Sequence, residues 1–211
     1  MATRKQYEKL VERIQNRYPD SKIKYKDEHW FWKRLPKMLS RSGITFPKTI
    51  WMPNRGTNLF GMLAHEYQHL VDYHKIGTIG FDIIYLSPQL LAILWIFLMI
   101  LAIGFSLKTF AIIFAIAGII SLLPWPSKGR TSLEMSGYSM TLFVAALSGQ
   151  NIFEYRKFIV DALKSWLYYK MVWTDKKALE LTLNAIDEIS DKEAITNKSV
   201  AFRDVYEIIT E

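Results

Sequence analysis

The sequence predicts a mainly α-helical fold with a small β-sheet, an α+β fold that is interrupted by an apolar helical hairpin. Three observations favour it: most apolar residues recur at helical spacing, only two short segments alternate as strands do, and the middle of the chain is almost uncharged. A chain of 211 residues is long enough for one domain with an insertion. We therefore expect an N-terminal part (residues 1–80), an apolar middle (81–127) and a helical C-terminal part (128–211).

The N-terminal part is expected to hold two helices and two strands. The apolar residues of segment 3–18 share one helical face. Segments 21–28 and 48–52 alternate apolar and polar residues, and the prolines on both sides of the second favour an edge strand. After a turn, a second helix is expected to start at Thr57 or Asn58 and to continue to about residue 75.

The apolar middle predicts a membrane hairpin. Residues 83–107 carry no charge, and after Lys108 a second uncharged run continues over 109–127. A transmembrane helix needs about 20 apolar residues. We expect two apolar helices, near 90–105 and 109–123, with the tip of the hairpin at residues 104–108. The sequence leaves open whether they span a bilayer, dip into it, or form a buried pair in a protein core.

The flanking charges predict the orientation of this hairpin. Lys and Arg exceed Asp and Glu in residues 1–80, and Lys128 and Arg130 follow the hairpin closely. By the positive-inside bias, we expect an integral membrane protein with both termini on the cytoplasmic side. Residues 1–20 are charged throughout and lack the apolar core of a signal peptide.

The C-terminal part is expected to be entirely helical. Helical periodicity predicts four helices, over residues 131–148, 151–172, 175–190 and 199–210. Thr174 and Asp175 are typical of the start of the third of these helices, and the polar residues 191–198 are expected to form a linker.

The chemistry is concentrated in the pentapeptide HEYQH at residues 65–69. The chain has no cysteine, so a bound metal would need His, Asp or Glu ligands. His65 and His69 are four residues apart and share a helix face, so both imidazoles can bind one ion. Glu66 lies beside them and can accept a proton from a water at the metal. This HExxH spacing is typical of zinc hydrolases and predicts Zn2+ as the cofactor; the alternative is a solvated helix face that happens to carry two histidines.

A tetrahedral catalytic zinc site needs a third protein ligand, for which Glu134 is the best candidate. The alternative is that Glu134 closes a capping box with Thr131 at the start of a helix. Gly137 would let this helix approach the histidines closely. Tyr138 is expected either to donate a hydrogen bond to the reaction's oxyanion or to pack in the core. Other candidate third ligands are Asp72, His74 and Glu154.

This combination of residues resembles the gluzincin metallopeptidases. The shared features are HExxH at 65–69, a later Glu in a helix with Tyr138 one turn on, and an apolar hairpin between the two. The layout is similar to HtpX-type and CAAX-protease-type membrane peptidases, and the Glu-x-x-Gly-Tyr pattern is similar to small phage-type gluzincins. The resemblance covers about residues 49–147. It implies a zincin-like domain with His65, His69 and Glu134 as metal ligands and Glu66 as general base.

The resulting prediction is a membrane-anchored zinc metallopeptidase that hydrolyses protein or peptide substrates at the membrane surface. Segment 49–52 is expected to pair with an extended substrate backbone. The basic and aromatic residues of 22–37 are expected to contact anionic lipid headgroups rather than nucleic acid. The other functions considered are a virion- or envelope-associated zincin, acting on cell wall or in membrane penetration, and a non-catalytic membrane adaptor.

Overall fold

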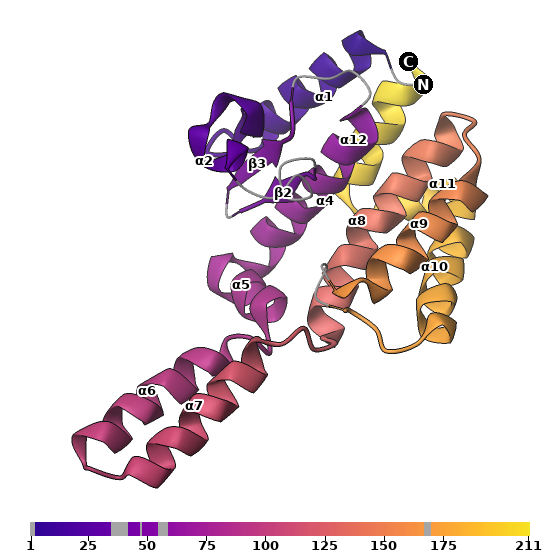
Figure 1. Ribbon diagram of the computed structural model, residues 1–211. Coiled ribbons are helices and arrows are strands. Elements are labelled where there is room, and N and C mark those ends of the chain that lie inside the picture. The colour runs from indigo at the N-terminus through magenta and orange to yellow at the C-terminus, as the bar shows by residue number, and fades with distance from the viewer. Residues whose placement is uncertain (1–2, 35–41, 47, 55–58, 167–169) are drawn as a thin grey trace.

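The computed structural model shows a helical domain with a small sheet, from which a two-helix hairpin projects (Figure 1). It describes residues 3–34, 42–46, 48–54, 59–166 and 170–211. The predicted mainly α-helical architecture with a small β-sheet is confirmed.

The first helix and the sheet occupy the N-terminal part. Helix α1 (Arg4–Arg17) is capped by Thr3 and buries the apolar stripe expected of segment 3–18. Three strands follow, β1 (Lys22–Tyr25), β2 (Ile44–Thr45) and β3 (Thr49–Met52). They lie in the order β1-β3-β2, with β1 parallel and β2 antiparallel to β3. A 3-10 turn (Lys26–Glu28) and the short helix α2 (Trp30–Lys33) separate β1 from β2.

Strand β3 is central, so the predicted edge position of segment 48–52 is wrong. Its side chains Ile50 and Met52 are fully buried, which draws the strand into the middle of the sheet. Strand β2, which forms its other neighbour, has only two residues. A strand of that length shows no alternation from which it could be predicted.

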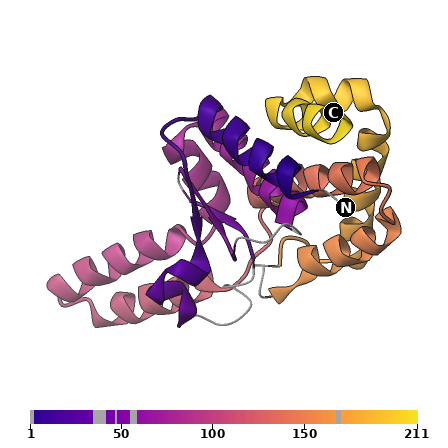
Figure 2. The ribbon, with the colours of Figure 1, turned by 90° about the horizontal axis from the view of Figure 1, so that it is seen from above.

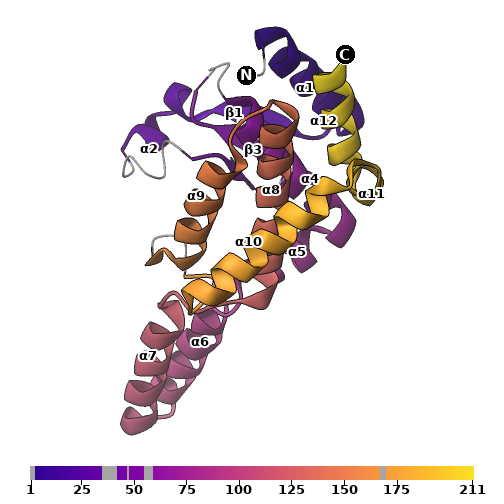
Figure 3. The same cartoon turned by 90° about the vertical axis from the view of Figure 1, so that its right-hand side faces the viewer.

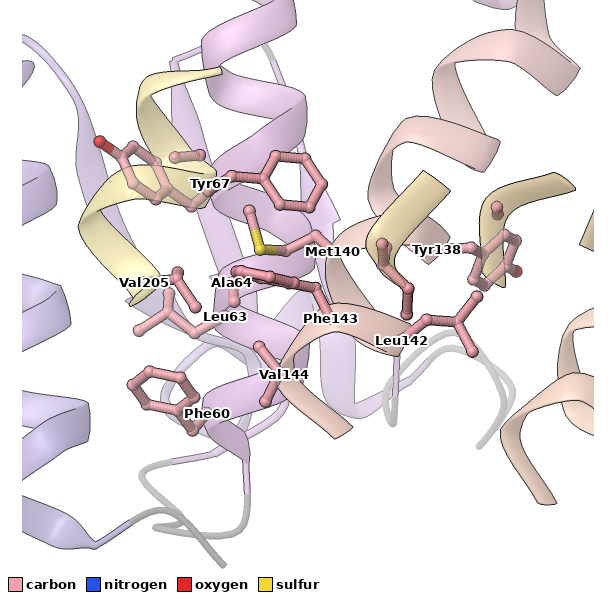
Figure 4. Packing of buried hydrophobic residues seen from close by; sticks show 14 of the residues in the cluster. Phe60, Leu63, Ala64, Tyr67, Tyr138, Met140, Leu142, Phe143, Val144 and Val205 are labelled. Carbon is pink, nitrogen blue, oxygen red and sulfur yellow. The ribbon is translucent and has the colours of Figure 1, made fainter. Parts of the chain in front are cut away.

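Two long helices form the centre of the domain. Helix α4 (Phe60–Ile76) packs against α8 (Lys128–Leu147), as Figure 4 shows. The buried hydrophobic cluster around these two helices includes Phe60, Leu63, Ala64 and Tyr67 of α4 and Met140, Leu142, Phe143 and Val144 of α8. Thr57 and Asn58, the expected first residues of α4, lie outside the described residues.

The apolar middle forms three helices. Gly77, with a φ of +84°, ends α4 and allows the chain to turn into α5 (Thr78–Leu86). Then α6 (Leu91–Gly104) and α7 (Lys108–Leu122) form an antiparallel pair that projects from the domain (Figures 1 and 2). The predicted hairpin is therefore present, and its turn lies between the end of α6 at Gly104 and the start of α7 at Lys108, within the expected tip 104–108.

The hairpin helices are shorter than expected of a span. They have 14 and 15 residues, against about 20 needed to cross a bilayer. Within the described part of the chain, no single helix combines the length and apolarity of a membrane span; α5 and α6 do so only as a pair bent by 84°. The membrane span itself stays a prediction.

The C-terminal helices pack against α8 or against one another (Figure 3). They are α9 (Ile152–Lys164), α10 (Asp175–Ser190), α11 (Lys192–Lys198) and α12 (Val200–Thr210). The expected helix 151–172 is too long: α9 ends at Lys164, and the buried residues Met171 and Val172 lie outside it. The expected linker 191–198 is also wrong: Asp191 caps a short helix that buries Ile195.

Candidate metal centre

Three side chains converge where α4 passes α8. The Nε2 atoms of His65 and His69 lie 3.1 Å apart, and the Oε2 atom of Glu134 is 3.9 Å from each of them. Bonds of about 2.0–2.1 Å around a tetrahedral zinc separate neighbouring ligand atoms by roughly 3.3 Å. The three atoms therefore fit around one small divalent ion, and the predicted group His65, His69 and Glu134 is brought together.

The ring nitrogen of His65 that faces away from this group forms a hydrogen bond with Thr141. The Nδ1 atom of His65 lies 3.1 Å from the Thr141 hydroxyl, and that hydroxyl donates to the carbonyl of Gly137 at 3.3 Å. If the Thr141 proton is directed to Gly137, Nδ1–H of His65 is the donor to Thr141 Oγ1. This tautomer leaves the lone pair of Nε2 free for a metal ion.

Burial keeps both imidazoles neutral. Desolvation is the main cause that lowers the pKa of His65 to about 3 and that of His69 to about 4. Histidine binds metals in its neutral form. Near neutral pH, the pair is therefore already in the protonation state that a metal ligand needs.

Glu134 is not a helix cap. Helix α8 begins one turn earlier than expected, at Lys128, with Ser127 as its N-cap. Glu134 therefore lies inside the helix, and the capping-box hypothesis with Thr131 is wrong. Its two oxygens have separate surroundings: Oε2 faces the histidines, while Oε1 accepts a hydrogen bond from the Tyr85 hydroxyl at 2.6 Å.

Glu66 is enclosed by the segment that contains β2. The Thr45 hydroxyl donates to its Oε2 atom at 2.8 Å, and a Cβ placed on Gly43 would lie only 2.5 Å from its Oε1 atom. Burial raises the pKa of Glu66 to about 8. A high pKa gives the carboxylate the proton affinity that a general base needs, while a metal ion beside it would favour the ionised form.

A buried cation lies near Glu66. Lys26 is 1% exposed, donates to the carbonyl of Ser42 at 2.8 Å, and lies 4.4 Å from the centre of the Trp32 ring. Desolvation lowers its pKa to about 8, and the charge of Glu66 acts against that shift. Lys26 thus supports the segment over Glu66 and adds a positive charge near its carboxylate.

Helix α8 approaches His65 closely through Gly137. A Cβ on Gly137 would lie 2.7 Å from the His65 Nε2 atom, so only glycine fits there without moving the ring. One residue on, the ring of Tyr138 is buried and lies edge-on to His65, with 5.1 Å between ring centres. The approach expected of Gly137 is present, and the role of Tyr138 towards an oxyanion stays a prediction.

The other candidate third ligands lie elsewhere. His74 is exposed and stacks on Tyr18, and Asp72 accepts a hydrogen bond from Gln68. Glu154 is exposed in the first turn of α9. Among the described residues, the group that can hold a metal is the one that contains Glu134.

No protein-family model, curated protein or solved structure matches this chain. The interpretation of the centre therefore depends on its own geometry and chemistry.

Sequence analysis missed three residues that contact the centre: Tyr85, Thr45 and Thr141. Tyr85 and Glu134 are 49 positions apart in the chain, and Thr45 and Glu66 are 21 apart. No periodicity connects positions so distant. Only Thr141 had a usable signal, because it lies one helical turn after Gly137 and so shares its face.

Proposed function

We propose that this chain is a zinc-dependent peptidase of gluzincin type, held at a membrane by its apolar hairpin. The observation that carries the proposal is the convergence of His65, His69 and Glu134, with Glu66 directly after the first ligand. Two neutral imidazoles and one carboxylate are a donor set that suits catalytic zinc. The alternatives of a cell-wall hydrolase and a non-catalytic adaptor gain no specific support from the site.

The three ligands would hold the ion, and the ion would supply Lewis acidity towards a peptide carbonyl. Glu66 accepts the proton of the attacking water and passes it to the leaving amine. Thr45 keeps the Glu66 carboxylate in place through its hydrogen bond. Tyr138, whose ring packs on His65, is the proposed donor to the oxyanion.

The substrate position proposed from the sequence needs correction. Strand β3 has a neighbour on each side and cannot accept a further strand. Among the described strands, the one beside Glu66 that lies at an edge of the sheet is β2 (Ile44–Thr45). We therefore place an extended peptide substrate along β2, where backbone hydrogen bonds would bind it with little regard to its side chains.

Most large apolar side chains of the hairpin are exposed and its fully buried positions are small residues, while Trp95 of α6 stacks on Phe114 of α7 between the helices. The buried residues are Ala92 and Ala102 in α6 and Gly118 and Ser121 in α7. The exposed ones include Ile93, Phe97, Ile100, Phe110, Ile113 and Ile116. Small residues between helices and large apolar ones outside are typical of helices in lipid. The hairpin therefore supports membrane attachment with both termini on one side, and from the flanking Lys and Arg we propose that this side is the cytoplasm.

Metal analysis combined with proteolysis tests the proposal. The full chain in detergent should bind one zinc ion and cleave unfolded casein. His65→Ala and His69→Ala should lose the zinc, whereas Glu66→Gln should keep it and lose cleavage. His74→Ala is the matched control, because His74 is exposed and stacks on Tyr18; it should keep both properties. Full zinc occupancy in both His65→Ala and His69→Ala would contradict the proposal.

A further inference from the structure

Helix α5 continues the apolar surface of the hairpin onto the domain. Three of its side chains, Ile79, Ile83 and Leu86, are 77%, 52% and 41% exposed. Spacings of four and three residues place them on one stripe of the helix. The opposite stripe carries Phe81 and Tyr85, which pack against the domain. The aliphatic stripe thus faces away from the domain.

The direction of α5 fits a surface at right angles to the hairpin. Helices α5 and α6 meet at 84°, so α5 lies nearly parallel to a bilayer plane when α6 stands along the membrane normal. In Figure 1, α5 lies between the domain and the base of the hairpin. Its aliphatic stripe therefore lies at the level where the hairpin would enter a membrane.

Two tryptophans lie at the same base. Trp125, just after α7, meets the ring of Trp173 at 6.0 Å between centres, and both rings are exposed. The ammonium group of Lys170 lies 4.7 Å from the centre of the Trp173 ring. Tryptophan and lysine are favoured at the level of the lipid headgroups.

We propose that α5 lies in the headgroup layer of a lipid bilayer, with Ile79, Ile83 and Leu86 against the acyl chains and the Trp125–Trp173 pair beside it. The inference rests on the proposed membrane attachment and adds a second contact to it. It also determines how far the metal centre lies from the membrane surface, because Tyr85 on the inner face of α5 donates a hydrogen bond to Glu134. The catalytic residues would then lie just above the headgroups.

Because the chain contains no cysteine, single cysteines can report the depth of each segment. We would label Ile83→Cys, Ile100→Cys and Lys5→Cys with an environment-sensitive dye. The full chain is then added to phosphatidylcholine–phosphatidylglycerol vesicles that carry nitroxides at the headgroup or deep in the acyl chain. The Ile83 label should be quenched mainly by the headgroup nitroxide, the Ile100 label by the deep one, and the Lys5 label by neither.

Quenching at Ile100 without quenching at Ile83 would overturn this inference and leave the hairpin anchor intact. Absence of quenching at both positions would overturn membrane attachment itself. As a second measurement, Ile79→Ser with Ile83→Ser should weaken vesicle binding at least fivefold. The matched control is Leu179→Ser with Leu183→Ser, an exposed pair at the same spacing on α10, which should change nothing. Equal binding by both double variants would also overturn the inference.

A different observation supports a second inference, on Tyr85. Its hydroxyl donates to Oε1 of Glu134, the oxygen that faces away from the histidines. The guanidinium of Arg130, one turn before Glu134 on α8, fixes the same segment: its Nε donates to the Tyr85 carbonyl at 2.7 Å. Tyr85 is thus held at both its backbone and its hydroxyl.

We infer that Tyr85 is a positioning residue, which turns Oε2 of Glu134 towards the metal. This inference rests on the proposed metal site. Hydrogen-bond partners behind a metal ligand typically affect metal affinity by 10–100-fold. Tyr85→Phe should therefore weaken zinc binding at least tenfold in a chelator competition, and should change the visible absorption spectrum of bound Co2+.

Tyr155→Phe is the matched control, because it removes a phenol hydroxyl on α9 that donates a hydrogen bond to Gln150. It should leave zinc affinity and the cobalt spectrum unchanged. Unchanged affinity and spectrum in Tyr85→Phe would overturn the role of Tyr85 while the parent still binds zinc. A parent chain that binds no zinc would overturn the metal site and this inference together.

Discussion

Two glycines determine how closely the backbone approaches the side chains of the metal centre. A Cβ on Gly137 would lie 2.7 Å from His65, and one on Gly43 would lie 2.5 Å from Glu66. A substitution at Gly137 should therefore affect metal binding, and one at Gly43 should affect proton transfer by Glu66. Gly137→Ala should displace the His65 ring and weaken zinc binding at least tenfold, as measured by chelator competition. Gly43→Ala should keep the zinc and lose most casein cleavage, because only the general base moves.

Gly61→Ala is the control for this pair. It lies on α4, and its added Cβ would make an ordinary contact of 3.7 Å with Val144. Replacing a helical glycine by alanine favours the helix by up to about 1 kcal/mol, so loss of helix cannot explain a defect in Gly137→Ala. Zinc binding of Gly137→Ala at parental strength would show that His65 is not a ligand in this position.

The raised pKa of Glu66 predicts that the free energy of unfolding of the metal-free chain depends on pH. Burial raises its folded pKa to about 8, while the unfolded chain ionises near the ordinary value of 4.5. Between these values the folded state holds a proton that the unfolded state has lost. The contribution of Glu66 to the free energy of unfolding is thus fully present below pH 4.5 and is lost as the pH rises to 8. Over this range the free energy of unfolding falls by at most about 1.4 kcal/mol per pH unit.

Glu66→Gln removes this titration and leaves the histidines unchanged. Chemical unfolding in a chelating buffer should show the variant gaining stability over the parent as the pH rises from 5 to 8. His65 and His69 have lowered pKa values, so each destabilises the fold when the pH is below its ordinary pKa of 6.5. This effect is the same in both chains and cancels in the difference between them. A stability difference that stays constant over this range would contradict the prediction.

The sequence identified His65, Glu66 and His69 because their relation is local. Four residues along a helix always bring two side chains to one face, whatever the fold. The contact of Thr45 with Glu66 depends instead on a two-residue strand, and that of Tyr85 with Glu134 on the turn at Gly77. Such contacts follow from the tertiary arrangement, which no short pattern contains.

At the scale of elements, helix α8 shows what the sequence could and could not settle. The sequence is compatible with Glu134 as a metal ligand and as part of a capping box, because it does not determine at which residue the helix begins. Ser127, not Thr131, caps α8, and this shift of one turn moves Glu134 into the helix. Helices α1, α10 and α12 were predicted closely, because each carries a capping residue before a strongly amphipathic pattern.

Two variants in α8 distinguish an effect on metal binding from an effect on the stability of the start of the helix. Glu134→Gln should lower zinc affinity at least tenfold, because a neutral amide is a poor zinc ligand, yet its oxygen can still accept from Tyr85. The metal-free stability should barely change. Thr131→Ala should keep zinc affinity and lose about 1 kcal/mol of stability, because the buried Thr131 hydroxyl bonds the carbonyls of Ser127 and Met171.

Thermal unfolding of the metal-free chains and chelator competition measure the two effects separately. Glu154→Gln is the control, since Glu154 is exposed in α9 and should affect neither quantity. Parental zinc affinity in Glu134→Gln would mean that the third ligand is not Glu134.

For the whole molecule, the hairpin divides the metal site in sequence but not in space. His65 and His69 precede it and Glu134 follows it, yet α4, α5 and α8 pack together at its base. Arg130 joins the two sides, because its guanidinium donates to the Tyr85 carbonyl and to Gln89. These contacts between the two sides of the site are made by residues outside α6 and α7.

This arrangement predicts that the membrane anchor can be removed without loss of the metal centre. Gln89 donates to the carbonyl of Leu123 at 3.0 Å, so the two ends of the hairpin lie side by side. A short Gly-Ser linker in place of residues 91–122 should close this gap and keep Arg130, Tyr85 and Glu134 in position. The shortened chain should bind zinc with parental affinity. It should also leave the membrane pellet after an alkaline wash that retains the parent, because the exposed apolar side chains of α6 and α7 are gone. Loss of zinc binding would show that the hairpin supports the metal site, and retention in the pellet would place the membrane contact elsewhere, on α5 first.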